Sequence, residues 1–485
     1  MGGVTKDDSD ENYVCYRCVD DDFLQREMKA SGKKQACSYC RRKGIRSWTL
    51  QTLADRVQEV FDEHFQLSSD QPDLWQEMLL RDKESDYVWF REGEEPQEII
   101  ASYAEVSREI AIDIVEIWSS SSEHDPFEFD EDPFGDEARY IEITTSHGQI
   151  ESSWSEMQDE LLHRTRFFSK STVDFLEELF NGIQEMSSYQ GTAVQILDPT
   201  DFDGIYRARI AETDNKLKEI LEGVPNQLGA QWGRSAKAGR MNAAGVTALY
   251  GAFDAETCIA EVRAPVGSQV VIGKFKLLRP LKILNLKHLE NIYKKMSLFD
   301  PNFHKISDKM HFLRSLSSRL SVPVFSDGEQ FDYLITQVIA EFLASIEPRI
   351  DGVAFASAQS GGESMNVVLF AHACEIKQPD FPQGTKTEFS VTADEDDDLE
   401  FNLVHKHPYP NGPAHTESDL IFENETQLIE KSTLELDFKS IQIRMIKAVK
   451  FTSSRSTVHH SELTGDIQEL YSHQFKGIDG PEFDF

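Results

Sequence analysis

Apolar residues in the first part of the chain recur with the spacing of amphipathic helices. The clearest stretch follows Trp48, where apolar side chains return every three or four positions and so mark one face of a helix. Its members are Leu50, Leu53, Ala54, Val57, Val60, Phe61 and Phe65. The same period runs from 96 to 118, which predicts a second helical stretch. Two more helices are predicted over 154–168 and 173–185. Together these stretches indicate a helical bundle.

The pattern changes after residue 190, where short apolar runs alternate with helical stretches. Short apolar runs bounded by turn residues are typical of buried strands. Strands are predicted over 191–199, 205–209, 248–252, 351–357, 366–370 and 441–451, with two more inside 270–286. Helices are predicted over 255–262, 288–295 and 304–320, and a further helix opens at a possible capping box from Ser326 to Glu329. The second half is therefore expected to have an α+β fold.

Composition divides the chain into four expected parts. Residues 1–47 contain a cysteine cluster, 48–190 the predicted bundle, and 191–378 the mixed strands and helices. A serine-rich, acidic stretch near 119–137 is predicted to be an exposed loop within the bundle. Residues 379–485 combine an acidic excursion, a strand expected to close the sheet, and a loose tail.

The charge balance excludes some classes of partner. The formal net charge of the 485 residues is −36, which disfavours broad nucleic-acid binding because phosphate contacts need clustered Lys and Arg. A local basic patch near 32–46 is the exception. No run of about 18 apolar residues occurs, and no charged-then-apolar leader begins the chain. A soluble, cytoplasmic protein that does not enter a membrane is expected, and an oligomer is compatible with the sequence.

Four of the six cysteines form two CxxC pairs, Cys15 with Cys18 and Cys37 with Cys40. Each CxxC turn brings two sulfurs to one side of an ion, and zinc favours four thiolates in a tetrahedron. A structural zinc knuckle is predicted, because four cysteine ligands leave no position for a catalytic water. The alternatives are free thiols or redox pairs, although neither pair lies beside an α/β unit. The surrounding basic residues either balance the charge of a Zn(Cys)4 centre or contact nucleic acid.

A glycine turn followed by a strand and a helix carries the most specific chemistry. Residues 239–267 read GRMNAAGVTALYGAFDAETCIAEVRAPVG. Arg240, Asn242 and Gly245 predict a tight polar turn, and a short strand centred on Tyr250 then leads into a helix that carries Glu261. A tyrosine and an acid are thereby placed at the mouth of a strand-turn-helix unit, where polar groups usually serve a ligand.

This stretch resembles the RES domain, a family named for its Arg, Glu and Ser residues. The shared pattern is GR-x-N-x2-G-x3-LY, an acidic turn, then T-x2-AEVR-x-P-x-G, and the resemblance extends from Tyr206 to Phe370. It implies a fold like that of diphtheria-toxin-type ADP-ribosyltransferases, with a small split β-sheet and flanking helices. It also implies an NAD-degrading toxin, commonly paired with an antitoxin. No GxGxxG after a strand and no P-loop motif is present, so a Rossmann or P-loop mode of nucleotide binding is not expected.

The resemblance assigns roles to residues from distant segments. Arg207 matches the family arginine, and its planar guanidinium suits a pyrophosphate or a ribose. The alternative role for Arg207 is a structural salt bridge. If the strand register differs by two residues, Arg209 takes the place of Arg207 in the site. Ser357 matches the family serine and would orient the amide or the ribose, whereas a serine ending a strand is otherwise a local hydrogen bonder. Arg240 and Asn242 would shape the same pocket.

The implied reaction needs one carboxylate. Cleavage between ribose and nicotinamide develops positive charge on the sugar, which Glu261 would stabilise, while Tyr250 would stack on the nicotinamide ring. If Glu261 is only an exposed helix residue, its pairing partners would be Arg263 and Lys274. NAD hydrolysis, phosphorolysis and ADP-ribosyl transfer to a macromolecule remain open, as does a non-catalytic nucleotide-sensing module.

The N-terminal extension resembles the HEPN helical bundle found in other long members of the family. HEPN ribonucleases carry Arg and His four to six residues apart on one helix. The nearest pair here, Arg139 and His147, is too far apart and lies in a stretch that resembles a strand. A scaffold or a docking surface for a protein partner is therefore expected rather than a ribonuclease.

Overall fold

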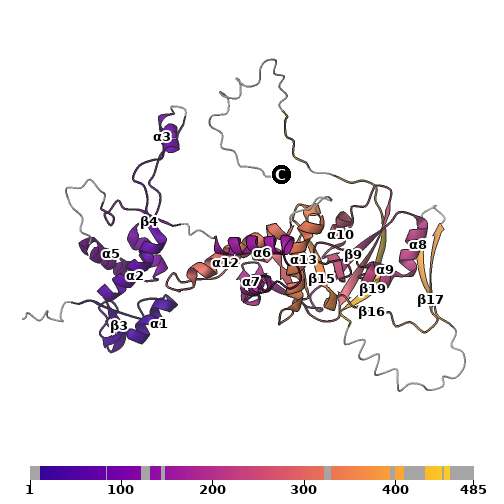
Figure 1. Ribbon diagram of the computed structural model, residues 1–485, viewed down its shortest axis with the longest axis horizontal. Coiled ribbons are helices and arrows are strands. Elements are labelled where there is room, and N and C mark those ends of the chain that lie inside the picture. Colours follow the sequence, from indigo (N-terminus) through magenta and orange to yellow (C-terminus); the bar gives the residue numbers. More distant parts are fainter. Residues whose placement is uncertain are drawn as a thin grey trace, which may run out of the picture.

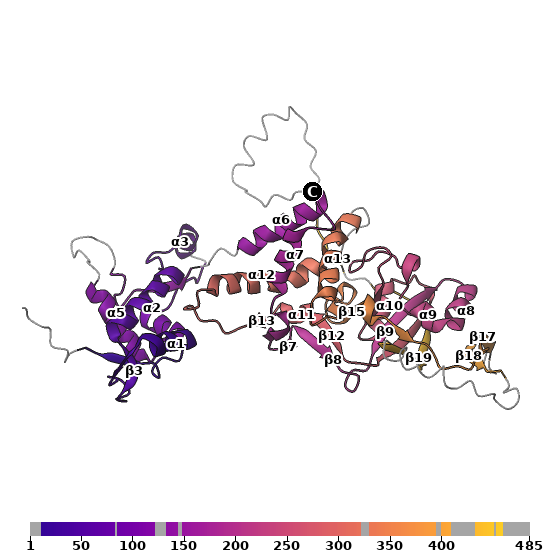
Figure 2. The same ribbon diagram turned by 60° about the horizontal axis from the view of Figure 1, so that its bottom comes forward.

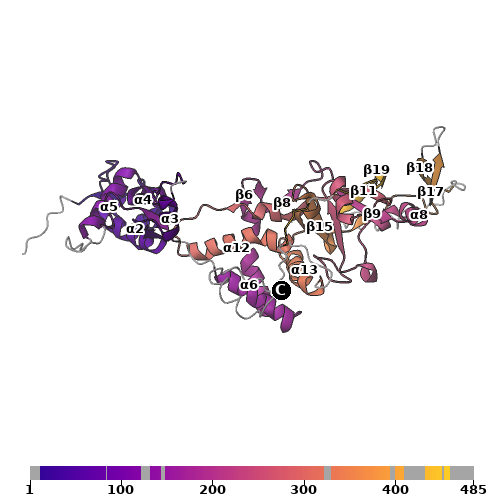
Figure 3. The same ribbon diagram turned by 90° about the horizontal axis from the view of Figure 1, so that it is seen from above.

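The computed structural model of the chain describes residues 11–82, 85–121, 132–143, 148–321, 329–393, 399–408, 432–450 and 453–458. Two lobes follow one another along an elongated molecule (Figure 1), and views from two further directions keep them apart (Figure 2, Figure 3). The N-terminal lobe holds the cysteine cluster and the first helices, and the C-terminal lobe holds a large sheet with its covering helices. The mixed fold class predicted from the sequence is confirmed.

The N-terminal lobe combines a small sheet with helices around one core. Its sheet has the order β1-β3-β2, formed by β1 (Tyr13–Cys15), β2 (Lys33–Gln35) and β3 (Ile45–Thr49). The helices are α1 (Asp22–Ser31), α2 (Leu50–His64), α3 (Leu74–Arg81), α4 (Pro96–Tyr103) and α5 (Arg108–Ser121). Val14 and Leu24 of the cysteine-bearing part share a core with Phe61 and Trp118 of the helices. The cysteine cluster and these helices therefore fold as one unit across residue 47.

Two helices replace the continuous stretch predicted over 96–118. Helix α4 ends at Tyr103 and α5 begins at Arg108, because Glu105 has a φ of 50°, which the helix cannot include. The amphipathic period continues across the break, since Ile100 and Ile110 both face the core. Helix α3 buries none of its side chains and projects from the lobe in Figure 1. A short strand pair, β4 (Phe65–Leu67) with β5 (Tyr140–Glu142), completes the lobe.

The C-terminal lobe is built on a nine-stranded sheet of order β16-β19-β11-β9-β10-β15-β14-β12-β8. Its strands are β8 (Val194–Leu197), β9 (Ile205–Ala211), β10 (Ala248–Ala252), β11 (Gln269–Leu277), β12 (Leu281–Asn285), β14 (Gly352–Ala356), β15 (Met365–Phe370), β16 (Ile376–Lys377) and β19 (Leu434–Met445). Strands β9 and β10 pair at one position only, Ala252 with Tyr206. At Gly251 a Cβ would lie 2.5 Å from the Ile205 side chain and 2.7 Å from the Tyr206 carbonyl, so the crossing requires glycine. The sheet is thus split in two between these strands.

Helices cover the sheet on both faces. One core gathers apolar residues of α6 (Gln149–His163), α7 (Lys170–Phe180), α12 (Phe303–Ser321) and α13 (Glu329–Ser345) against β12, β14 and β15. The other is closed by α8 (Asp214–Glu222) and α9 (Val224–Leu228), and α10 (Ala255–Val262) packs beside β9. Helices α6 and α7 lie within 48–190 but belong to the core of the C-terminal lobe, so the cores do not divide at residue 190.

Several predictions of elements are wrong in detail. The helix expected over 288–295 is a short α11 (Leu286–Leu289) followed by β13 (Ile292–Tyr293), which pairs with β6 (Ser187–Ser188) beside β7 (Gly191–Thr192). The helices expected over 154–168 and 173–185 begin earlier, as α6 and α7. The strand expected over 441–451 begins at Leu434 and ends at Met445.

The acidic excursion contains a hairpin that the sequence did not indicate. Strands β17 (Lys386–Ala393) and β18 (Leu399–Lys406) pair through eight positions at the far end of the C-terminal lobe (Figure 1). Ser326 of the predicted capping box and most of the acidic run at 394–400 lie outside the described residues. Among the described residues, no helix is long and apolar enough to cross a membrane.

Candidate functional site

The glycine turn holds Tyr250 in a fixed orientation. The Tyr250 hydroxyl donates to Asn242 Oδ1 at 2.7 Å and accepts from the Met241 backbone N–H at 2.9 Å. At Gly239 a Cβ would lie 2.5 Å from this hydroxyl, so the turn can close over the tyrosine only with glycine there. Gln337 Nε2 of α13 donates to the carbonyls of Gly239 and Asn242, which ties the turn to that helix. Burial raises the pKa of Tyr250 to about 12, so its hydroxyl is protonated at neutral pH.

Glu261 lies in the last turn of α10, at the end of the strand-turn-helix unit. Asp254 caps the helix start by accepting from the Thr257 backbone N–H, and Arg263 ends the helix with a φ of 49°, in the left-handed region. Glu261 Oε1 accepts from Ser357 Oγ at 2.6 Å and from Asn366 Nδ2 at 2.7 Å. Among the described residues, no hydrogen bond reaches Oε2 of Glu261. One carboxylate oxygen is therefore fixed, and the other is open to solvent because Glu261 is an exposed residue that lines the cavity.

Ser357 lies behind this carboxylate rather than in the open space before it. Its side chain is 0% exposed, and its hydroxyl donates to Glu261 while accepting from the Gln359 backbone N–H at 3.2 Å. Asn366 of β15, which is 7% exposed, supplies the second donor. The sequence predicts that Ser357 contacts the amide or ribose of a ligand, and in the structure its hydroxyl is hydrogen-bonded to Glu261.

Arg207 of β9 carries a buried charge that forms no ion pair with any described residue. The residue is 6% exposed, and its Nη1 makes no hydrogen bond among the described residues. Burial lowers its pKa to about 9, with a smaller contribution from the neighbouring charge of Arg209. A guanidinium with this pKa is still protonated at neutral pH. A buried, unsatisfied donor costs about 1–3 kcal/mol, and more when charged, so this group requires an explanation such as a bound water, an ion or a ligand.

Arg209, the rival position on the same strand, is held differently. Its Nε donates to the Gln227 carbonyl at 3.1 Å, and burial lowers its pKa. Residues two apart on a strand face the same side, and both arginines line one cavity.

These groups meet in a cavity of 690 Å³ at the split of the sheet, within the size range of small-molecule sites. It is lined by Arg207, Ala208, Arg209, Arg240, Tyr250, Gly251, Cys258, Glu261, Val262, Arg263, Tyr333, Phe355, Ala356, Ala358, Gln359, Asn366, Val367 and Val368. Four of these side chains are guanidinium groups and one is a carboxylate. Within a chain of net charge −36, this cavity is a local concentration of positive charge.

The structure brings most of the residues named from the sequence to this cavity. Arg207, Arg240, Tyr250 and Glu261 line it, and Arg240 Nη1 also donates to the Leu320 carbonyl at 3.2 Å. Asn242 does not line it, because its Nδ2 donates to three carbonyls of its own loop and its Oδ1 accepts from Tyr250. Asn242 therefore shapes the pocket by holding the tyrosine.

Sequence reasoning missed Asn366, Arg263 and Tyr333 as lining residues. Asn366 carried no signal, since an asparagine at the start of a strand is usually a turn residue. It reaches Glu261 because β15 pairs with β10, which sets Asn366 opposite Ala252, just ahead of α10. Strand register therefore decides its role.

The four cysteines of the N-terminal lobe gather as the spacing predicted. Cys15 Sγ lies 3.7 Å from Cys18 Sγ and 3.5 Å from Cys40 Sγ, and Cys18 Sγ lies 3.8 Å from Cys37 Sγ. A zinc ion about 2.3 Å from four tetrahedral sulfurs would set them about 3.8 Å apart. The donor set and its dimensions therefore fit a tetrathiolate metal site.

In a comparison with protein families, the model of the RES domain matches residues 209–392. Searches of curated proteins and of solved structures give no match. The matched range includes Tyr250, Glu261 and Ser357 and begins two residues after Arg207.

Proposed function

This chain carries a RES domain, and from that premise we propose that it is an enzyme that consumes NAD by cleaving the bond between nicotinamide and ribose. The observation that carries the proposal is the buried, unpartnered Nη1 of Arg207, which shares one cavity with the carboxylate of Glu261. A cation and an acid from distant segments both lack a full set of partners there. A ligand with an anionic part and an electron-poor centre would satisfy both.

The anionic part is the pyrophosphate. Guanidinium groups form paired hydrogen bonds to phosphate oxygens, and four of them line the cavity. Arg207 supplies a buried donor, Nη1, that has no hydrogen-bond partner among the described residues, so a phosphate oxygen would satisfy it. Arg240 and Arg263 reach the same space from the glycine turn and from the end of α10.

The electron-poor centre is the ribose carbon from which nicotinamide departs. Positive charge develops on the sugar as this bond breaks, and a fixed carboxylate stabilises it where it appears. Ser357 and Asn366 hold Oε1 of Glu261, so Oε2 is the oxygen directed to the sugar or its 2′-hydroxyl. Nicotinamide departs as a neutral molecule, so no general acid is needed, and among the described residues Glu261 is the one carboxylate that lines the cavity.

Tyr250 offers an aromatic face to the same cavity. Because its hydroxyl is bound to Asn242 and to the Met241 backbone, the ring is held in place where it lines the cavity. We assign it to stacking on the nicotinamide ring. Asn242 and Ser357 then position Tyr250 and Glu261 rather than contact the substrate.

The wider role is that of a toxin or defence effector that depletes NAD, with an antitoxin as its protein partner. The cysteine cluster would hold one zinc ion through Cys15, Cys18, Cys37 and Cys40, where it stabilises the N-terminal lobe without taking part in the reaction. We also propose that this acidic chain is located in the cytoplasm and binds no nucleic acid.

The test is release of nicotinamide from NAD by the full chain, followed with and without added phosphate. Glu261→Gln should reduce the rate by on the order of 100-fold or more. The matched control is Glu256→Gln on the same helix, which loses only an exposed ion pair with Arg444 (2.7 Å) and should keep full activity.

The other outcomes separate the competing functions. Nicotinamide released only in the presence of a macromolecular acceptor would identify an ADP-ribosyltransferase. NAD that is bound and recovered intact would identify a sensing module and overturn the enzyme assignment. Full activity in Glu261→Gln would show that the reaction takes place elsewhere.

A further inference from the structure

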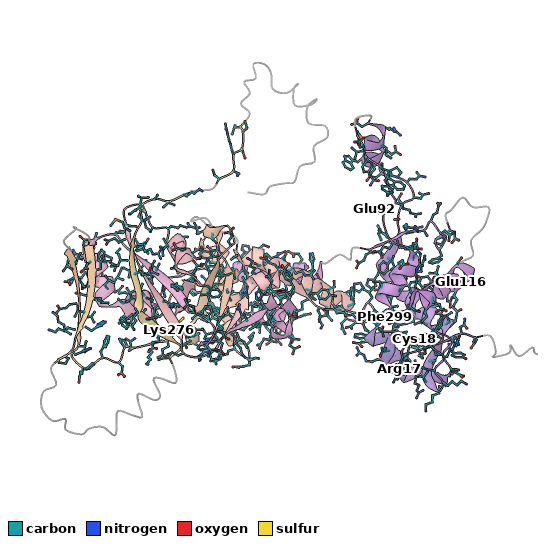
Figure 4. The ribbon with its side chains drawn as sticks, turned by 180° about the vertical axis from the view of Figure 1, so that it is seen from behind. Arg17, Cys18, Glu92, Glu116, Lys276 and Phe299 are labelled. Carbon is teal, nitrogen blue, oxygen red and sulfur yellow. The ribbon has the colours of Figure 1, made fainter. Side chains whose placement is uncertain are left out.

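The two lobes are joined by the segment that precedes α12. Phe299 is 1% exposed and packs in the core of the N-terminal lobe, where its ring stacks on Tyr103 with centroids 5.7 Å apart. Figure 4 labels Phe299 at the edge of that lobe. Lys295 Nζ pairs with Glu105 at 2.6 Å in the same joint. Helix α12 therefore begins directly at the N-terminal lobe.

Two histidines and a glutamate meet at this joint. The start of α12 brings His304 against the end of α2, where Glu63 and His64 lie. His304 Nε2 is 3.0 Å from Glu63 Oε1, and the rings of His304 and His64 stack with centroids 4.9 Å apart. One ligand atom from each of the three residues lies within 4.8 Å of the other two.

His64 is the unusual member of this cluster. It is 2% exposed, yet no hydrogen bond to its ring occurs among the described residues. This buried ring lies beside the carboxylate of Glu63 and the imidazole of His304, and the ring of Phe303 packs edge-on against it, with centroids 5.0 Å apart.

We propose that Glu63, His64 and His304 form a binding site for a divalent transition-metal ion at the junction of the two lobes. Two imidazoles and one carboxylate are a ligand set that suits zinc and its neighbours cobalt and nickel. The ion would replace the proton in the hydrogen bond between Glu63 and His304 and would also bind a ring nitrogen of His64. Three protein ligands leave one position for water.

The site closes by movement of its exposed members. Ligands of one such ion lie about 2.0–2.2 Å from it, hence about 3–3.5 Å from one another. The side chains of His304 and Glu63 are 45% and 59% exposed, so both are able to turn toward the fixed ring of His64. The ion would link α2 to α12, and the last turn of α12 carries the Leu320 carbonyl that accepts from Arg240 of the cavity.

The ligand chemistry separates this site from the cysteine cluster. Full-length protein is prepared with one equivalent of zinc in the cysteine site and dialysed against Co²⁺, and bound cobalt and zinc are counted by mass spectrometry. We expect one cobalt ion per chain, with zinc retained and without the thiolate-to-cobalt charge-transfer absorption that cobalt in the cysteine site would produce. His304→Gln should weaken cobalt binding at least about 10-fold, and Glu63→Gln should do the same.

The control is His311→Gln, an exposed histidine of the same helix, which should bind cobalt as the wild type does. His304 is exposed, so its variant should fold, and circular dichroism checks this. The proposal is overturned if the wild type retains no cobalt, if cobalt binding always brings the thiolate absorption, or if His304→Gln binds cobalt as tightly as the wild type. None of these readings depends on NAD cleavage.

Discussion

Replacing Ser357 by alanine tests whether this buried hydroxyl acts through Glu261 or directly on a ligand. The substitution removes one oxygen atom from a residue that is 0% exposed, so it opens little space. It deletes the 2.6 Å hydrogen bond to Glu261 Oε1 and leaves Asn366 as the remaining donor to that oxygen. The carboxylate should then sample orientations that direct Oε2 away from the sugar.

The size of the effect follows from the kind of bond lost. A hydrogen bond to a charged group contributes about 1.5–3 kcal/mol, and each 1.36 kcal/mol of barrier is tenfold in rate. Ser357→Ala should therefore slow nicotinamide release by about 10- to 100-fold. The thermal midpoint should also fall slightly, because the substitution removes the 3.2 Å hydrogen bond from the Gln359 backbone N–H to the Ser357 hydroxyl.

A double-mutant cycle with Glu261→Ala provides the decisive comparison. If the hydroxyl acts only on the carboxylate, Ser357→Ala should change the residual rate of the Glu261→Ala variant by less than about twofold. Nicotinamide is followed over long incubations at high enzyme concentration, so that this slow rate can be measured.

A matched control comes from the same hairpin. The Ser364 hydroxyl is buried and has no hydrogen-bond partner among the described residues, so Ser364→Ala should leave the rate unchanged. The reasoning fails if Ser357→Ala slows the Glu261→Ala variant as much as it slows the wild type, because the hydroxyl would then act on the substrate independently of the acid.

Three further predictions concern charge and metal. Arg207→Met should abolish nicotinamide release and yet raise the thermal midpoint by a few degrees, since it removes an uncompensated buried charge worth about 1–3 kcal/mol; a lower midpoint in calorimetry would indicate a structural salt bridge. Burial opposes ionisation of Asp351, but His372 and Arg279 outweigh it and hold its pKa well below the ordinary 3.8, so the unfolded chain binds more protons in acid and the stabilisation is lost as the pH falls below about 4. Asp351→Asn should thus lower the free energy of unfolding at pH 7 by about 3 kcal/mol, and with it the thermal midpoint. The difference in midpoint between variant and wild type should shrink in acid, and a difference independent of pH would contradict this. Cys37→Ser should remove one equivalent of zinc and unfold the N-terminal lobe, seen as a lost transition in circular dichroism; an unchanged transition in metal-free protein would refute a structural metal.

The sequence was sufficient where function depends on local spacing. The two CxxC pairs predicted a cluster of four sulfurs, and the cluster forms because each turn sets two of them side by side before any tertiary contact is made. The strand-turn-helix unit around Tyr250 and Glu261 was likewise readable, since a glycine turn, a short apolar run and an Asp cap are all local signals.

Predictions from the sequence failed where long-range pairing overrides a weak local pattern. The apolar positions over 288–295 are compatible with a helix or a strand, and pairing of β13 with β6 selects the strand. The β17–β18 hairpin lies in a stretch whose acidic composition predicted a loop, but Phe389 and Leu403 pack against the C-terminal core. In both cases the structure is decided by contacts with a distant part of the chain, through strand pairing in the first and through apolar packing in the second.

The sequence by itself determined which chemical groups are present and which short segments carry them. Only the tertiary structure decided their partners. Pairing of β15 with β10 gives Glu261 a second donor in Asn366, and burial of Ser357 directs its hydroxyl to the acid. The split between β9 and β10 leaves Arg207 inside the protein with no ion pair to any described residue. The physical reason is that whether a polar group is satisfied depends on all of its neighbours in space, and the order of residues along the chain specifies only a few of them.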